Sequence, residues 1–166
     1  MNCYRISKYD PRYRDENGKY IVDDWTSFSD VNQEILGAIL SIKEYETTEI
    51  NYLTLLNKIF IQSGCKRLRI VEYENASNNS LPWYDGQMLN TNEEIALFAK
   101  DCLRELCWGK LVGKRLFIHF GYDYYMYVAT QEHLEKIQSL TKENGLYCEK
   151  IMSPYFQAKD FFRYYF

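Results

Sequence analysis

RLFIHFGYDYYMYVA, residues 115–129, contains the strongest β-strand signal in the chain. Two sets of side chains alternate along 116–120 and again along 124–129, which is the period of a strand with two different faces. Gly121 and Asp123 lie between the two runs, and both residue types favour tight turns. The stretch therefore predicts a β-hairpin, and with it a sheet that is at least partly antiparallel.

Helix start and stop signals surround this hairpin. Ser41 with Glu44, and Thr91 with Glu94, have the spacing of capping boxes, in which a hydroxyl and a carboxylate bind the first free amides of a helix. Gly64 is placed where a helix often ends in a left-handed residue. Together with the alternating segments, these signals predict helices over 31–36, 42–63, 92–107 and after Thr130, strands over 3–7, 19–25, 68–73 and 146–151, and a long loop over 74–91.

The order of these elements indicates an α+β fold with a mixed, partly antiparallel sheet and about three to four helices. At 166 residues the chain fits a single domain, residues 1–166, whose core requires no disulfide or metal. Its last segment, residues 154–166, is an aromatic tail rich in Phe and Tyr. We expect so apolar a tail to dock on the body or on a second copy, so a homodimer through the tail is one alternative.

The formal net charge of −3 is unevenly distributed. Residues 21–60 carry seven carboxylates and only two lysines. An acidic segment favours the approach of a basic partner, although a plain solvated surface is the alternative interpretation. No long basic run is present, so the composition argues against a nucleic-acid partner.

Cysteine spacing and hydropathy exclude further classes. The five cysteines form no Cys-x-x-Cys pair, which argues against a zinc site or a disulfide framework. No apolar stretch approaches the roughly 18 residues of a membrane span, and the N-terminus has no apolar signal region. The sequence therefore predicts a cytoplasmic protein with no metal, no cofactor and no membrane association.

Catalytic motifs are missing, and one pair of residues remains as a catalytic alternative. The chain has no Gly-rich phosphate loop, no nucleophile elbow and no His-Glu-x-x-His. His119 precedes Asp123 by four residues, and a histidine oriented by a carboxylate can act as a general base. A small-ligand site or enzyme centred on this pair is therefore an alternative to a binding function.

The aromatic pattern favours a binding surface instead. Tyrosine and tryptophan beside carboxylates are typical anchors of selective protein interfaces. If the apolar face of the hairpin packs under helices, its other face meets either a second layer or a partner. The predicted partner-binding residues are Trp25, Asp23, Asp24, Asp30, Trp83, Tyr84, His119, Asp123, Tyr125 and Tyr127.

Three segments also carry a family resemblance: YRISKYD at 4–10, WTSFSD at 25–30 and HFGYDYYMY at 119–127. With these segments, the chain resembles small bacterial cytoplasmic proteins that are grouped with immunity proteins of polymorphic toxin systems. The resemblance implies a non-catalytic, stoichiometric inhibitor that occludes a cognate toxin, often a nuclease. It assigns no catalytic residue to this sequence.

Overall fold

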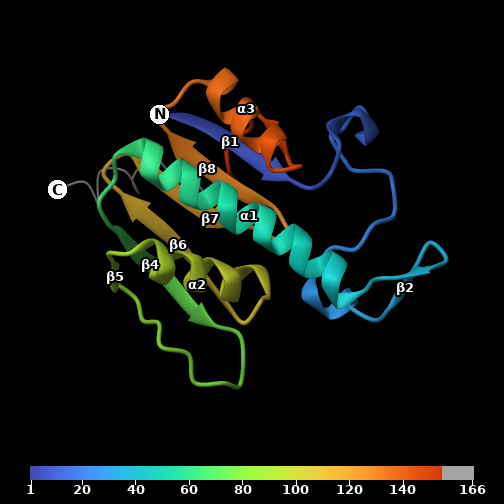
Figure 1. The fold of residues 1–166 in the computed structure, drawn as a ribbon, viewed down its shortest axis with the longest axis horizontal. Helices are drawn as coiled ribbons and strands as arrows, with labels where there is room; N and C mark the ends of the chain where they lie inside the picture. The colour runs from blue at the N-terminus through green and yellow to red at the C-terminus, as the bar shows by residue number, and fades with distance from the viewer. Residues whose placement is uncertain (155–166) are drawn as a thin grey trace.

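The predicted hairpin forms the middle of a seven-stranded sheet in the computed structural model (Figure 1). The strand order is β5-β4-β6-β7-β8-β1-β9, and every pairing within this sheet is antiparallel. The α+β class is therefore confirmed. The strands are β1 (Asn2–Ser7), β4 (Leu68–Asn75), β5 (Met88–Leu89), β6 (Cys107–Gly113), β7 (Leu116–Phe120), β8 (Met126–Thr130) and β9 (Tyr147–Glu149).

The structure describes residues 1–154. The predicted aromatic tail falls outside these residues apart from Pro154, and so does the homodimer contact suggested for it. Within the described part, none of the helices combines the length and the apolar character that crossing a bilayer requires.

Three helices cover one face of the sheet (Figure 1): α1 (Ile42–Ser63), α2 (Asn92–Leu103) and α3 (Leu134–Glu143). Both predicted capping boxes form at the starts of α1 and α2, and Gly64 ends α1 with a left-handed φ of 66°. Because all three helices lie on the same side, residues 1–154 give the sheet one face that is covered by helices and one back face on which they place no helix. We call these the helix face and the back face.

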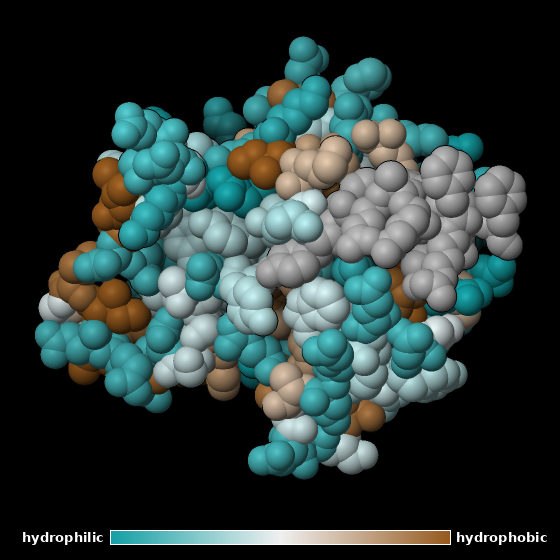
Figure 2. All heavy atoms as spheres, turned by 180° about the vertical axis from the view of Figure 1, so that it is seen from behind, coloured by the Kyte–Doolittle hydropathy of each residue, from teal (hydrophilic) through white to brown (hydrophobic). Residues whose placement is uncertain are grey.

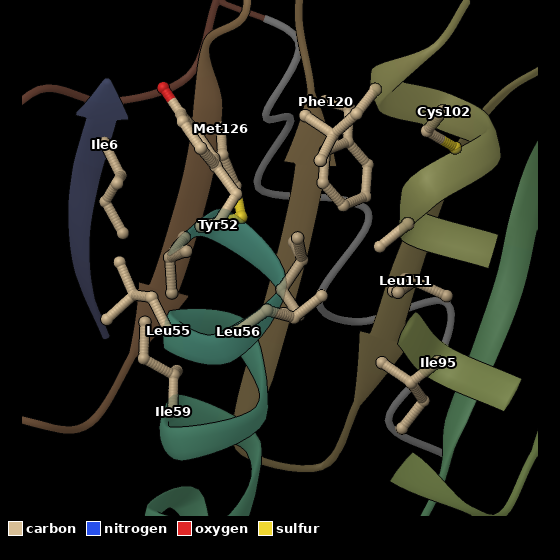
Figure 3. Close-up of a cluster of buried hydrophobic side chains, with 14 of the residues drawn as sticks. Ile6, Tyr52, Leu55, Leu56, Ile59, Ile95, Cys102, Leu111, Phe120 and Met126 are labelled. Carbon is tan, nitrogen blue, oxygen red and sulfur yellow. The ribbon is translucent and has the colours of Figure 1, made fainter. Parts of the chain in front are cut away.

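The main core lies between α1 and the sheet. Figure 3 shows Tyr52, Leu55 and Ile59 of α1 pointing toward β1 and β8, with Phe120 and Leu111 beside α2. These side chains are buried, and most of them are fully enclosed. Burying each such side chain contributes roughly 1.5–3 kcal/mol, so α1 is the main source of the hydrophobic stabilisation of the sheet.

Two predictions for the N-terminal third are wrong. Residues 19–25 do not form a strand, and their pairing is limited to one isolated bridge between Arg14 and Tyr20. Residues 31–36 do not form a helix, because Leu36 and Gly37 adopt left-handed φ angles of 51° and 78°. They instead make the turn of a small hairpin formed by β2 (Glu34–Ile35) and β3 (Ala38–Ile39).

The predicted helix over 92–107 is too long by four residues. It ends at Leu103, and Glu105 adopts a left-handed φ of 58° that no helix can continue through. Cys107 then starts β6, which pairs with β4 and β7. The reversal brings the sulfurs of Cys102 and Cys107 to 3.8 Å, although a continuous helix would have placed them on different faces.

A buried ion pair connects the helices where this reversal begins. Arg104 Nε donates to Glu49 Oε2 at 2.6 Å, and Arg104 Nη2 donates to Glu49 Oε1 at 2.9 Å. Glu49 is only 2% exposed. The guanidinium also lies 4.8 Å from the ring centre of Phe28. One side chain thus links α1, the end of α2 and the short 3-10 helix Phe28–Asp30.

Arg104→Ala should lower the free energy of unfolding by about 3 kcal/mol, because the Glu49 carboxylate would stay buried without its bidentate partner. Urea unfolding at neutral pH measures this loss. The double variant Glu49→Leu/Arg104→Met replaces the pair with apolar side chains and should recover most of the stability. A loss below about 1 kcal/mol in Arg104→Ala would show that the pair does not hold the helices together.

Candidate functional site

Several predicted binding residues gather at the end of the sheet where β7 turns into β8. We call this end of the sheet the hairpin end. Residues 121–125 form it, and it is flanked by residues 8–30 and by residues 104–108. The register explains this gathering, because β1 and β4 end at this edge while β6 starts there. Three segments that are distant in the sequence therefore meet around one turn.

The β7–β8 connection is a strained two-residue turn. Asp123 and Tyr124 both have positive φ angles, 56° and 62°. The amide of Tyr125 donates to the carbonyl of Tyr122 at 3.2 Å, and the amide of Gly121 donates to the carbonyl of Tyr125 at 2.8 Å. This is the geometry of a hairpin turn that usually contains Asn-Gly or Asp-Gly. Aspartate tolerates the left-handed region, whereas a tyrosine there requires stabilisation from its surroundings.

Core aromatic residues provide that stabilisation. The Tyr124 ring packs at 5.1 Å from Tyr52, 5.1 Å from Trp25 and 5.6 Å from Tyr45. The buried hydroxyl of Tyr52 donates to the Tyr124 carbonyl at 2.8 Å. Burial raises the pKa of Tyr124 well above its usual value. The turn is therefore held by its second residue, which leaves Tyr122 73% exposed beside Asp123.

A first hollow, which we call the N-terminal groove, lies between the turn and the segment after β1. Its volume is about 300 Å³. Four predicted partner-binding residues line it, namely Asp23, Asp24, Asp123 and Tyr125. Its remaining lining residues are Tyr9, Arg14, Gly18, Lys19, Tyr20, Val22 and Thr26. The groove thus has carboxylates on both sides, but Arg14 and Lys19 make its charge mixed.

The floor of the N-terminal groove is rigid. Arg14 donates to the hydroxyl of Tyr125 at 3.1 Å and forms two bonds of 2.9 and 3.0 Å to Glu149. Arg5 reaches the same carboxylate at 2.9 and 3.1 Å. Tyr125 is consequently half-buried in a hydrogen-bonded network, and its role within the molecule is to fix the groove.

Lys8 has an unusual environment next to this groove. Its side chain is 8% exposed, and Nζ lies 4.0 Å from the Trp25 ring centre and 4.4 Å from that of Tyr9. Asp24 forms an ion pair with it at 2.7 Å. Burial lowers the pKa of Lys8 to about 8, and Asp24 only partly opposes this shift. Asp24 is therefore committed to an internal partner.

Most carboxylates of the predicted acidic segment are used in the same internal way. Asp30 accepts the amides of Thr26 and Ser27 at 2.7 and 3.0 Å, so it caps the 3-10 helix. Glu44 caps α1, and Glu49 pairs with Arg104. The segment 21–60 is thus not an uninterrupted acidic face. Its acidity is largely consumed in building the fold.

A second hollow, of about 570 Å³, lies on the other side of the turn. We call it the Glu105 hollow. It is lined by Glu74, Asn75, Ala76, Cys102, Glu105, Cys107, Trp108, Phe120, Gly121 and Tyr122. Because Tyr122 lines this hollow and Asp123 lines the N-terminal groove, the turn forms the ridge between the two.

Glu105 is the functional candidate that sequence reasoning missed. Burial raises its pKa, and the negative charges of Asp30 and Asp123 raise it further. Neither Glu105 nor Asp123 has an ion-pair partner among the described residues. Glu105 and Asp123 therefore bring negative charge to the hairpin end without a direct ion pair to neutralise it. Glu105 was not among the predicted binding residues because it fell within the predicted helix 92–107, where a carboxylate normally faces solvent.

His119 and Tyr127 are placed elsewhere. They lie on the back face, buried, with their rings stacked 5.8 Å apart, and His119 Nδ1 is 3.3 Å from Ser153 Oγ. Burial lowers the pKa of His119 to about 4, helped by the nearby charge of Lys110. Figure 2 views the molecule from behind and shows mostly hydrophilic and pale side chains with separate brown groups. His119 and Asp123 therefore have different surroundings.

Trp83 and Tyr84 line neither of the two hollows beside the turn. They belong to the connection between β4 and β5, and β5 is the edge strand opposite to β9. Trp83 is buried against Phe98, and its Nε1 donates to Asp101 Oδ2 at 2.7 Å. Tyr84 is 63% exposed. The predicted set therefore does not form one surface.

Trp25 contributes structure more than surface. It is half-buried, packs 5.3 Å from Tyr45, and its carbonyl accepts from the Tyr9 hydroxyl at 3.3 Å. Its indole supports the turn through Tyr124 and covers Lys8. Within residues 1–154, no group of three or more His, Cys, Asp or Glu side chains has the geometry to hold a metal ion.

Tyr52→Phe should destabilise the turn, because the Tyr124 carbonyl would lose its buried donor. We expect a loss of about 1–2 kcal/mol in unfolding free energy and faster hydrogen exchange at the Gly121 amide. The matched control is Tyr13→Phe, since Tyr13 is 48% exposed and should tolerate the change. Equal exchange rates at the Gly121 amide in Tyr52→Phe and wild type would show that the Tyr52 hydroxyl does not stabilise the turn.

Lys8 should give the stability a measurable pH dependence. Its folded-state pKa of about 8 lies below the ordinary value of 10.5, so the folded protein releases this proton first and gains stability as pH rises. The stability difference between wild type and Lys8→Met should shift by about 1 kcal/mol in favour of wild type from pH 7 to pH 9. Urea unfolding of both proteins at each pH tests this, and a pH-independent difference contradicts it.

Comparison with protein-family models, with curated proteins and with solved structures gave no match for this chain. The resemblance to immunity proteins, which was based on residues 4–10, 25–30 and 119–127, therefore stays a hypothesis. The chemistry of the hairpin end is the remaining guide to function.

Proposed function

We propose that this protein is a non-catalytic, immunity-like inhibitor that binds a cognate bacterial toxin through its hairpin end and occludes it. The observation that carries the proposal is the concentration of Asp30, Glu105 and Asp123 around one exposed turn. A basic partner would neutralise these charges. Of the predicted partner-binding residues, only those at the hairpin end belong to the proposed interface.

The chemistry of a nuclease partner favours an acidic inhibitor surface. A nuclease active site holds phosphates with cationic groups, so an inhibitor that occludes it benefits from a complementary acidic surface. Like charges held close together repel one another, and this repulsion is relieved when a cation is brought between them. The same field also accelerates the encounter with a basic protein.

The turn gives this surface an anchor. Tyr122 is 73% exposed and stands between the N-terminal groove and the Glu105 hollow. An exposed tyrosine on a rigid turn loses little conformational freedom on binding and buries a large ring, which is typical of binding hot spots. Hollows on both sides of the ridge can receive side chains from the partner.

The catalytic alternative receives no comparable support. It requires His119 and Asp123 in one pocket, but His119 is enclosed on the back face while Asp123 lines the N-terminal groove. A histidine whose pKa is about 4 is also a weak base at neutral pH.

The direct test is co-expression with the product of the neighbouring reading frame. We expect a one-to-one complex in which the toxicity of that product is suppressed. Asp123→Asn and Glu105→Gln should each weaken binding by about tenfold, because each removes one charge from the acidic edge. Asparagine suits the left-handed conformation at 123, so this variant should keep the turn intact.

Glu135→Gln is the matched control. Glu135 is exposed in the first turn of α3, which follows the far end of β8, so the same loss of charge is made away from the hairpin end. Binding that is unchanged in the two acidic-edge variants, or equally weakened in the control, would remove the hairpin end from the interface. An active product in a stable complex would contradict occlusion.

A further inference from the structure

The opposite end of the sheet from the hairpin end holds a third hollow, of about 570 Å³, that is lined by cations. We call it the basic hollow. Its lining residues are Gly64, Cys65, Lys66, Arg67, Arg69, Met88, Val112, Gly113, Lys114 and Arg115. Half of these residues carry a positive charge, and no carboxylate is among them. The sequence has no basic run of this size, because residues 66–69 and 114–115 meet only in the fold.

The sheet register builds the wall of the basic hollow. Arg69 of β4 pairs with Val112 of β6 on one side and with Met88 of β5 on the other. Directly paired residues share one face of a sheet, so the three side chains are neighbours. Arg69 alternates with the core residues Leu68 and Ile70, and it therefore lies on the back face.

The base of the basic hollow is tightly built. A Cβ at Gly113 would lie 2.4 Å from Cys65 Sγ and 2.7 Å from Leu68 Cδ2. The absence of a side chain at Gly113 thus allows the end of α1 to approach the β6–β7 turn. Cys65 Sγ in turn contacts the Arg67 carbonyl at 3.1 Å. The close packing of Gly113 against Cys65 and Leu68 therefore holds the basic residues 66–69 next to residues 114–115.

The five cations differ from most other basic groups in their pairing. Arg5, Lys8, Arg14, Arg104 and Lys110 each contact a carboxylate. Among the described residues, none of the five in the basic hollow forms an ion pair. Like charges that are gathered without counter-charges repel one another, and an anion would relieve that repulsion.

The negative end of the α1 dipole accounts for only part of this arrangement. Lys66 and Arg67 directly follow the helix C-terminus, where cations are favourable. Arg69, Lys114 and Arg115 belong to β4 and to the β6–β7 turn, so the helix end does not explain them. An anionic ligand in the basic hollow would account for Arg69, Lys114 and Arg115.

We propose that the basic hollow binds a compact, multiply charged phosphate compound, such as a nucleoside triphosphate. Arginine binds phosphate oxygens through two parallel hydrogen bonds, and lysine contributes a point charge. The volume is within the range of small-molecule sites. Met88 and Val112 add an apolar wall on which a base or another non-polar group can lie.

The charge of the whole chain favours a compact anion over a nucleic-acid strand. The formal net charge is −3, and removing these five cations leaves −8 on the remainder of the protein. A strand that extends beyond the basic hollow would meet this negative surface. Strand binding usually requires a charged groove that follows the backbone over several nucleotides.

Calorimetric titration of the full chain with inorganic tripolyphosphate, and then with ATP, tests the proposal at low ionic strength. We expect saturable one-to-one binding of both compounds. Arg69→Glu and Arg115→Glu should each weaken it by about tenfold, because each replaces an attraction with a repulsion. Both side chains are exposed, so the variants should keep the fold, which circular dichroism can check.

Lys43→Glu is the matched control, since it makes the same charge change roughly 30 Å away along α1. It should leave phosphate binding unchanged. A similar loss in this control would indicate only a general charge effect and would overturn the proposal. The proposal would also be overturned if neither compound bound saturably. An affinity for oligothymidylate that rises with its length would overturn it too, because it would indicate binding of a strand.

Discussion

The hydrogen bond from the buried Tyr52 hydroxyl to the Tyr124 carbonyl connects the main helix to the central hairpin. It is made inside a cluster of aromatic rings, where water cannot replace a missing partner. The turn it holds is strained, because Tyr124 has a φ of 62°. The position of Asp123 and Tyr122, and thereby the shape of the hairpin end, depends on this contact.

The antiparallel sheet separates charge between its two ends. At one end, the left-handed residues Glu105 and Asp123 bring carboxylates close to Asp30. At the other, the close approach at Gly113 brings residues 66–69 beside residues 114–115. Since strands of an antiparallel sheet reverse at each end, every turn adds its residues to one of these two edges. A chain with a small net charge therefore carries carboxylates without ion-pair partners at one end of the sheet and cations without them at the other, within the part that the structure describes.

The sequence predicted where the two longer helices begin from local signals. Capping boxes at Ser41 and Thr91 are local signals, and both helices begin where these signals place them. The end of α2 was missed because the left-handed conformation of Glu105 depends on strand pairing beyond it. Asp30 was predicted at a binding surface, and the structure adds that its carboxylate caps a 3-10 helix. Neither outcome is encoded within a few residues.

The sequence by itself determined the α+β class, the central hairpin at 115–129 and the amphipathic helix at 42–63, since periodicity and capping act over one or two turns of chain. Only the tertiary structure decided which charges are used internally and which are left at the surface. The partners of Lys8 and Glu49, and the like-charged neighbours of Glu105, are set by contacts between distant segments. Charge interactions act through space rather than along the chain, so the two charged sites exist only after folding.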